Sequence, residues 1–208
     1  MSDEHTAVRW DGIYAESSGL TNSWYRPEPA FALEVVAELG MPLDGAVVDV
    51  GGGAGNLVDG LLAAGHSDLT VVDLSATALD IARRRLGLVG DRVAWVATDV
   101  LSWTPPRTYA LWHDRAMLHF LVERADRARY LTVLRAATAP SSHVVLATFA
   151  PDGPTSCSGA PVHRYDGARL AELLGPDFGP GVVLREIHRT PAGHEQPFTW
   201  AVFTRLQT

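Results

Sequence analysis

The chain contains no lysine and only one cysteine, and each absence excludes a class of chemistry. All 17 basic side chains belong to arginine. A Schiff-base lysine enzyme is therefore excluded, and so is a phosphate loop that depends on lysine. The single cysteine, Cys157, cannot form an internal disulfide or build a cysteine cluster for zinc or an iron–sulfur centre.

The chain also lacks the features of a nucleic-acid or membrane protein. Its 24 acidic and 17 basic side chains give a formal net charge of −7, which argues against broad binding to a phosphate backbone. No apolar run approaches the ~20 residues that span a bilayer, and residues 1–5 lack the apolar core of a signal peptide. We therefore predict a cytoplasmic protein, monomeric or homodimeric, with neither nucleic acid nor membrane as a partner.

Short apolar runs alternate with helical patterns along most of the chain. The runs predict strands at 46–50, 69–73, 93–97, 109–113 and 143–149. Helices are expected from Pro27-Glu28-Pro29 to Gly40 and at 57–62, 76–86, 124–137 and 166–174. Two further strands, 182–189 and 198–204, are joined by a turn-rich segment and so predict an antiparallel hairpin.

This order of elements predicts an α/β fold. We expect a Rossmann-like, seven-stranded, mostly parallel sheet with helices on both faces and the antiparallel hairpin at its C-terminal edge. The length suits a single domain over residues 1–208. Within it, residues 1–29 are expected to form an irregular cap with one short helix over the active site, and residues 30–208 the α/β core.

A glycine-rich turn follows the first predicted strand, with the sequence Asp49-Val50-Gly51-Gly52-Gly53-Ala54-Gly55. Such a turn between a strand and a helix lets the backbone approach a ligand closely. The dinucleotide fingerprint G-x-G-x-x-G does not fit, because its third glycine would fall on Asn56 or Val58. A nicotinamide-dependent dehydrogenase is therefore a poor interpretation.

The spacing Asp49-x-Gly51-x-Gly53-x-Gly55 instead resembles the first motif of the class I S-adenosylmethionine-dependent methyltransferases. The resemblance implies S-adenosyl-L-methionine as cofactor and S-adenosyl-L-homocysteine as product. It also implies that Asp73, after the second strand, binds the ribose hydroxyls and that Asp99, after the third, contacts the adenine. The full set of expected cofactor-binding residues is Asp49, Gly51, Gly53, Gly55, Asp73, Leu74, Asp99, Val100, Tyr14 and Trp24.

Segments 23–29, 111–116, 119–121 and 148–154 are similar to a bacterial group of small methyltransferases. That group is similar to the thiopurine and tellurite methyltransferases and, more distantly, to small protein-lysine methyltransferases. Substrates vary widely across these relatives. The resemblance therefore implies the cofactor much more specifically than the acceptor.

The residues after the fourth predicted strand face the methyl group in such relatives. The candidate catalytic residues are His113, Asp114 and His119, because an imidazole with a pKa near 6.5 suits proton removal at neutral pH. Asp114 can equally pair with Arg115 or cap a helix, and His119 can be a buried core group. The paired acids of magnesium-dependent catechol methyltransferases are missing, so no metal is expected.

Candidate acceptor-binding residues come from the predicted cap and from loops near the mouth of the site. They are Tyr25, Arg26, Arg115, Cys157 and Arg164. The planar fork of Arg164 can hold an anionic acceptor, and aromatic rings in the cap can favour a cationic sulfonium. Alternatively, the cap aromatics only cover the sheet edge, and Cys157 is simply a small loop residue.

The leading hypothesis is methyl transfer from S-adenosylmethionine to a heteroatom (sulfur, nitrogen or oxygen) of a small-molecule acceptor. A compact chain with a short cap and an aromatic-lined entrance favours a small acceptor over a macromolecule. Two alternatives remain open at this point. One is a protein-lysine methyltransferase with an open acidic entrance, and the other is a non-catalytic S-adenosylmethionine-binding protein.

Overall fold

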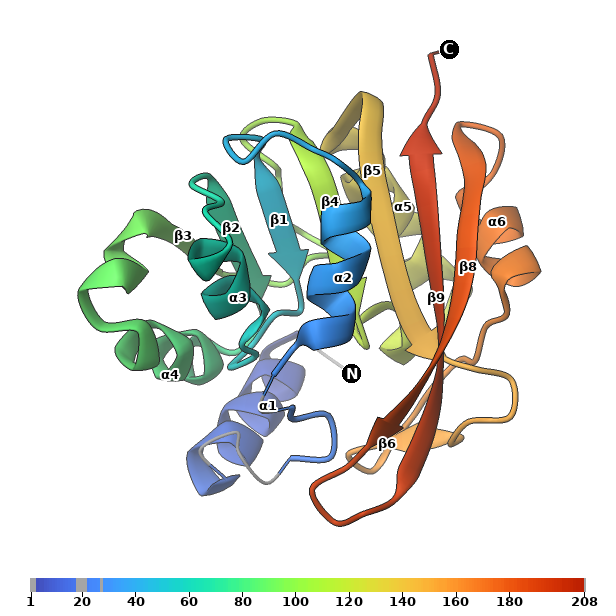
Figure 1. Ribbon diagram of the computed structural model, residues 1–208. Coiled ribbons are helices and arrows are strands. Elements are labelled where there is room, and N and C mark those ends of the chain that lie inside the picture. The colour runs from blue at the N-terminus through green and yellow to red at the C-terminus, as the bar shows by residue number, and fades with distance from the viewer. Residues whose placement is uncertain (1–2, 18–21, 27, 208) are drawn as a thin grey trace.

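Seven strands form one sheet in the computed structural model, which describes residues 3–17, 22–26 and 28–207. Their spatial order is β3-β2-β1-β4-β5-β9-β8 (Figure 1). Strands β1 to β5 run parallel, whereas β9 is antiparallel to both β5 and β8. This confirms the predicted α/β fold and its hairpin. The strands are β1 (Val47–Val50), β2 (Leu69–Asp73), β3 (Val93–Ala97), β4 (Tyr109–Arg115), β5 (Thr138–Phe149), β8 (Phe178–Arg189) and β9 (Glu195–Arg205).

Helices cover both faces of this sheet (Figure 1). Helices α2, α3 and α4 pack in one apolar core, and α5 and α6 pack in the other. Among the helices in the described ranges, none is long and apolar enough to cross a bilayer. The helices are α2 (Ala30–Glu38), α3 (Leu57–Ala63), α4 (Ala76–Leu86), α5 (Arg124–Ala136) and α6 (Gly167–Leu174), with short 3-10 helices η1 (Gly87–Arg92) and η2 (Leu118–Phe120).

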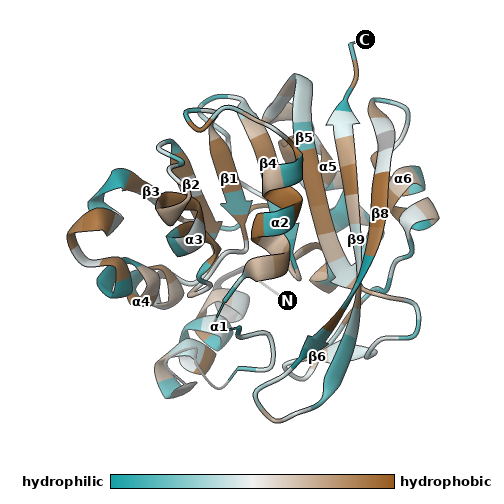
Figure 2. Ribbon diagram, in the orientation of Figure 1, coloured by the Kyte–Doolittle hydropathy of each residue, from teal (hydrophilic) through white to brown (hydrophobic). Residues whose placement is uncertain are grey.

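The central strands are apolar because both of their faces are covered (Figure 2). On β1, Val47 belongs to the core under α2 and α3, whereas Val48 and Val50 belong to the core under α5. The second core also contains a polar contact, in which the indole of Trp112 donates to the hydroxyl of Tyr130 at 2.9 Å. Burial of a hydroxyl is tolerated where it has such a partner.

The N-terminal segment is more regular than the sequence indicates. Instead of an irregular cap with one short helix, residues Asp3–Ser17 form the 15-residue helix α1. This helix lies at the carboxyl ends of the parallel strands, beside the start of α4 (Figure 1). Asp11 fixes it there, because its carboxylate accepts hydrogen bonds from the Ser75 hydroxyl at 2.6 Å and the Thr77 amide at 3.1 Å.

Other boundaries differ from the prediction by a few residues. Helix α2 begins at Ala30, after Pro29, while Pro27 lies outside the described residues. Strands β5, β8 and β9 each begin earlier than expected. In β5 the extra residues include polar Ser141, which has a positive φ of 74°, and a register shift separates them from the main strand. A short two-stranded ribbon, β6 (Ser156–Cys157) with β7 (Ala160–Pro161), follows β5.

Candidate active site

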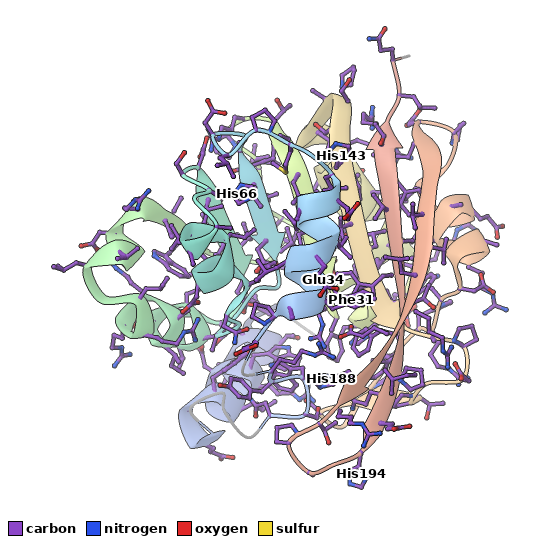
Figure 3. The ribbon with its side chains drawn as sticks, viewed as in Figure 1. Phe31, Glu34, His66, His143, His188 and His194 are labelled. Carbon is purple, nitrogen blue, oxygen red and sulfur yellow. The ribbon has the colours of Figure 1, made fainter. Side chains whose placement is uncertain are left out.

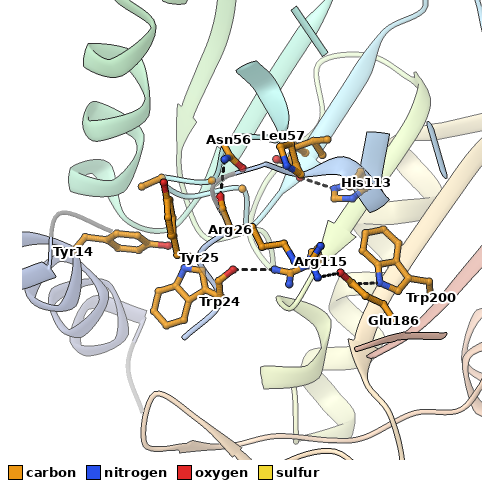
Figure 4. A pocket seen from close by; sticks show the side chains of 17 residues that line it. Tyr14, Trp24, Tyr25, Arg26, Asn56, Leu57, His113, Arg115, Glu186 and Trp200 are labelled. Atoms are coloured by element: carbon orange, nitrogen blue, oxygen red, sulfur yellow. Dashed lines mark hydrogen bonds and ion pairs between the residues drawn. The ribbon is translucent and has the colours of Figure 1, made fainter. Parts of the chain in front are cut away.

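A pocket opens at the carboxyl ends of β1 and β4, where the strand order changes direction (Figure 4). Open α/β sheets bind ligands at this switch point. Its walls come from the glycine turn, the segment before α2, β4 and the C-terminal hairpin. The lining residues are Tyr14, Trp24, Tyr25, Arg26, Pro29, Ala32, Asp49, Gly51, Gly52, Ala54, Gly55, Asn56, Leu57, His113, Arg115, Glu186 and Trp200.

The floor of the pocket is a backbone turn that requires glycine. Gly51 and Gly53 have positive φ values of 68° and 51°, a conformation that side chains disfavour. A Cβ atom at Gly51 would lie 2.5 Å from the Cβ of Met117, and one at Gly53 would meet the hydroxyl of Tyr14. The bare backbone lets a ligand approach the N-terminus of α3 closely, so the turn fits the cofactor that the sequence predicts.

Asp73 ends β2 next to this turn. Its Oδ1 accepts the amide of Ser75 at 2.8 Å, and the amide of Gly53 is a second donor to the carboxylate. Burial raises the pKa of Asp73 to about 6 despite these hydrogen bonds. The hydroxyl of Tyr14 lies nearby, and burial together with the Asp73 charge raises the pKa of that phenol. Asp73 is thus placed to meet a ligand held on the glycine turn.

The other residues expected to hold the adenosine half do not line this pocket. In the described part of the chain, the lining omits Gly53, Asp73, Leu74, Asp99 and Val100. These positions lie at or just after the ends of β2 and β3 or in the turn itself. Oδ1 of Asp99 accepts the amide of Leu101 at 2.9 Å.

His113 and Asp49 form a buried pair in the pocket wall. The register of β1 with β4 sets Asp49 opposite His113, and His113 Nδ1 lies 2.7 Å from Asp49 Oδ1. In the tautomer with a proton on Nδ1, Asp49 Oδ1 accepts the Nδ1–H and Nε2 is the basic nitrogen. Nε2 is buried and has no hydrogen-bond partner among the described residues. This arrangement can accept a proton from a ligand in the pocket.

A network of charged side chains closes the pocket on the hairpin side. Arg26 forms an ion pair with Glu186, and its Nε donates to His188 Nδ1 at 2.9 Å. His188 Nε2 donates to the carbonyl of Ser23 at 2.7 Å, and the indole of Trp200 donates to Glu186 at 2.7 Å. Burial first, and then nearby arginine charge, lowers the pKa of His188 to about 4. The network joins the segment before α2 to β8 and β9.

Glu186, Trp200 and His188 are absent from the set of candidate residues that the sequence predicts. The structure buries all three side chains. Nothing in the local pattern of β8 or β9 indicates a site, because the three residues become partners of Arg26 only through the tertiary fold. Figure 3 shows His188 toward the α1 side of the molecule, whereas His66 and His143 lie toward the opposite end of the sheet.

Arg115 lines the same pocket at the end of β4. Its Nη1 donates to the carbonyl of Trp24 at 3.3 Å, and its guanidinium lies 4.7 Å from the ring centre of Phe198. Burial lowers its pKa to about 10, Glu186 opposes this shift, and the charge of Arg26 adds to it. Arg115 therefore stays protonated at neutral pH.

Asp114 points to the opposite face of β4 and is absent from the pocket lining within the described residues. Its carboxylate accepts the amide of Met117 at 3.0 Å, the amide of Leu118 at 3.2 Å and the hydroxyl of Tyr130 at 2.8 Å. Burial raises its pKa to about 6. These contacts correspond to the capping alternative for Asp114, because they close the turn that begins η2.

His119, Cys157 and Arg164 also stand outside the lining in the described chain. His119 is fully buried between Phe120 and Phe149, and burial lowers its pKa to about 3. Cys157 is buried in β6, which raises the pKa of its thiol. Arg164 donates to the carbonyl of Gly153 at 3.1 Å. The structure thus brings together Tyr14, Trp24, Tyr25, Arg26, Asp49, Gly51, Gly55, His113 and Arg115 of the predicted set.

Comparisons with known proteins point to one class. A family model described as "Methyltransferase domain" matches residues 47–141. A trans-aconitate 2-methyltransferase from Methylobacterium radiotolerans is 33% identical over 147 residues, which is 70% of this chain and 50% of that protein. The chain therefore spans about half the length of this curated relative.

Solved structures share the fold over nearly the whole chain. The Burkholderia thailandensis 1,6-didemethyltoxoflavin-N1-methyltransferase, with 1,6-didemethyltoxoflavin and S-adenosylhomocysteine bound, has a TM-score of 0.71 at 24% identity and covers 100% of this chain and 92% of its own. A structure from work on converting a disulfide into a thioacetal during echinomycin biosynthesis has a TM-score of 0.75 at 20% identity, covering 96% and 93%.

The strand order, the glycine turn and the family match together define a methyltransferase fold. Residues 47–141 match the methyltransferase family model, and the chain shares the fold of S-adenosylmethionine-dependent methyltransferases. The cofactor of this class is S-adenosyl-L-methionine, in agreement with the sequence prediction.

Proposed function

We propose that the protein transfers a methyl group from S-adenosylmethionine to a sulfur, nitrogen or oxygen atom of a small-molecule acceptor. One observation carries the proposal. The glycine turn and the buried His113–Asp49 pair face the same pocket, and the free Nε2 of His113 belongs to that pair. A cofactor cradle and a proton acceptor are thus adjacent, as methyl transfer to a protonated heteroatom requires.

Each part of the pocket has a role in this reaction. The bound cofactor supplies a methyl group that is already activated. The backbone of Gly51–Gly55 would hold the cofactor, and the carboxylate of Asp73, next to the pocket, would accept hydrogen bonds from its ribose hydroxyls. His113 Nε2 would take the proton from the acceptor heteroatom, and Asp49 would keep the imidazole oriented. The methyl group would leave the sulfonium sulfur, and S-adenosylhomocysteine would remain as the product. Trp24 and Trp200 help to exclude water.

The charges in the pocket favour a small acceptor over a lysine side chain. Glu186 is paired with Arg26, so the guanidinium of Arg115, which has no contacting counter-ion among the described residues, opposes the entry of an ammonium group. The names of the relatives support a small acceptor too, since one acts on trans-aconitate and another on 1,6-didemethyltoxoflavin. The thiopurine or tellurite subtype, the cytoplasmic location and the monomeric or homodimeric state stay predictions.

Isothermal titration calorimetry tests the cofactor first. We expect saturable binding of S-adenosylhomocysteine and none of NAD. A panel of thiols, amines and phenols with labelled S-adenosylmethionine then tests transfer. Saturable cofactor binding without transfer to any acceptor class would favour the non-catalytic alternative, and transfer to a lysine peptide alone would favour the protein methyltransferase.

The role of His113 has its own variant. His113→Gln should lower kcat by roughly 10²- to 10⁴-fold, the usual contribution of general base catalysis, and leave the Kd for S-adenosylhomocysteine within about twofold. His143→Gln is the matched control, because His143 lies at the opposite end of the sheet (Figure 3). An unchanged kcat in His113→Gln would remove the general base from the proposal.

A further inference from the structure

We propose that the methyl acceptor is an organic acid and that the guanidinium of Arg115 binds its carboxylate. This inference rests on the proposed function, because it names the substrate class of the same pocket. It starts from one polar group. Nη2 of Arg115 is buried in the pocket wall and has no hydrogen-bond partner in the part of the chain that the structure describes.

The other charged groups of the pocket already have partners. Asp49 holds His113 at 2.7 Å, and Glu186 pairs with Arg26 and also accepts the indole N–H of Trp200. These two carboxylates are therefore engaged.

By contrast, the contacts of Arg115 are to neutral groups, the carbonyl of Trp24 and the ring of Phe198. No ion pair of Arg115 is found among the described residues, although the charge of Glu186 acts on it from farther away. The pocket is thus left with one cation that lacks a contacting counter-ion.

The surroundings of Arg115 make an anion the matching ligand. Burial, followed by the charge of Arg115, lowers the pKa of His119 to about 3 and that of His188 to about 4. Both imidazoles are therefore neutral near pH 7. A buried cation without a counter-ion is costly, and a planar guanidinium with a free N–H matches a carboxylate in both charge and shape.

The cofactor also carries a carboxylate, on its amino acid part. The position of Arg115 assigns the carboxylate that it binds to the acceptor and not to the cofactor. The glycine turn follows β1 and Asp73 ends β2, on one side of the switch point. Arg115 ends β4 and faces Phe198 of β9, on the other side. Figure 4 shows Arg115 beside Glu186 and Trp200, the hairpin side of the pocket. The glycine turn and the guanidinium thus come from different sides of the switch point.

The test measures binding of matched acids and amides to the protein loaded with S-adenosylhomocysteine. Phenylacetate is compared with phenylacetamide, and succinate with succinamide, by calorimetry. We expect at least one acid to bind tenfold or more tightly than its amide. Arg115→Gln should weaken the acid tenfold or more and leave the amide unchanged. Arg129→Gln is the control, because its side chain is 66% exposed on α5, and it should behave as wild type.

A second arm separates the two sources of a carboxylate. S-Adenosylhomocysteine carries an amino acid carboxylate, and 5′-methylthioadenosine does not. Arg115→Gln should leave the Kd of both within threefold. A tenfold loss for S-adenosylhomocysteine alone would assign the guanidinium to the cofactor and overturn the proposal. Wild-type protein that binds the cofactor product but prefers no acid over its amide would overturn it as well.

Two further outcomes keep the test decisive. If the wild type fails to bind S-adenosylhomocysteine, the proposed function itself fails, which is distinct from a failure of the acid preference. If Arg115→Gln does not fold, Arg115→Lys takes its place, because it keeps the charge and loses the planar fork. We expect Arg115→Lys to weaken the acid at least threefold, and an unchanged affinity would count against the carboxylate site.

Discussion

Asp73 is the residue whose titration should be visible in cofactor binding. Its pKa is raised to about 6, mainly by burial. The ionised carboxylate is the form that accepts hydrogen bonds from ribose hydroxyls. The affinity for S-adenosylhomocysteine should therefore be full above pH 6 and fall as the pH drops through about 6, by up to roughly tenfold per pH unit. Calorimetry between pH 5 and pH 8 measures this profile.

Asp73→Asn should remove the pH dependence along with the affinity. Loss of hydrogen bonds to a charged group costs about 1.5–3 kcal/mol, so the Kd should rise roughly ten- to hundredfold. Asp80→Asn is the control, because Asp80 is an exposed carboxylate on α4. If Asp73→Asn binds with wild-type affinity at pH 8, Asp73 is not the ribose ligand.

Asp114 should matter for stability instead of cofactor binding. Asp114→Ala leaves the Met117 and Leu118 amides and the Tyr130 hydroxyl without their acceptor. At pH 4.5, where folded Asp114 is neutral, we expect the free energy of unfolding to fall by about 2–4 kcal/mol. Urea denaturation measures this change, and Tyr130→Phe, which removes one of the three donors, should cost about 1 kcal/mol.

The pH dependence of that loss has a definite sign. The pKa of Asp114 is raised to about 6 in the folded protein, from 3.8. Its contribution to stability is therefore complete below pH 3.8 and is lost as the pH rises through about 6. The effect of Asp114→Ala should be smaller at pH 7 than at pH 4.5. A larger effect at pH 7 would mean that the ionised carboxylate is the stabilising form.

At the scale of elements, the local sequence predicts the strands and helices that are marked by nearby residues. The bounds of β2, β3 and α4 coincide with the predicted ranges 69–73, 93–97 and 76–86, because buried runs and the Ser75 cap mark them. Helix α1 was predicted only as an irregular cap with one short helix. Its place depends on Asp11 and on the packing of Trp10 against Phe120, with ring centres 5.2 Å apart, which are contacts over long sequence distances.

Helix α1 should therefore loosen when its contact with α4 is removed. Asp11→Ala deletes the acceptor of the Ser75 hydroxyl and the Thr77 amide, at a cost of about 1 kcal/mol, typical of a lost helix cap. Hydrogen exchange should become faster in Asp3–Ser17 and stay unchanged in α5. Asp80→Ala, on the exposed side of α4, is the matched control. Equal exchange of α1 in both variants would show that Asp11 does not hold it.

At the scale of the whole molecule, the site could be predicted only in part. The glycine turn and the residues that end β1, β2 and β4 can be predicted from the sequence as site residues, because parallel strands bring their carboxyl ends to one edge of the sheet. The pairing of Asp49 with His113 depends on strand register, and the contact between Arg26 and His188 joins positions 162 residues apart. A single sequence carries no local signal for either, so the hairpin half of the pocket was missed.

Cofactor binding should stabilise the whole molecule, because the pocket joins α1, the glycine turn, β4 and the hairpin. S-Adenosylhomocysteine at about 100 times its Kd should add roughly 2.7 kcal/mol to the free energy of unfolding. For a chain of this size, that is a rise in Tm of about 5–11 °C, measured by differential scanning calorimetry.

The same concentrations of NAD should leave the Tm unchanged. With S-adenosylhomocysteine, Asp73→Asn should show a smaller rise in Tm than the wild type, because the variant binds this ligand with a higher Kd. This comparison separates binding at the glycine turn from non-specific stabilisation, since a general solvent effect would raise the Tm of wild type and variant equally. Equal shifts in Tm for the two proteins would mean that the ligand, including its ribose, binds away from Asp73.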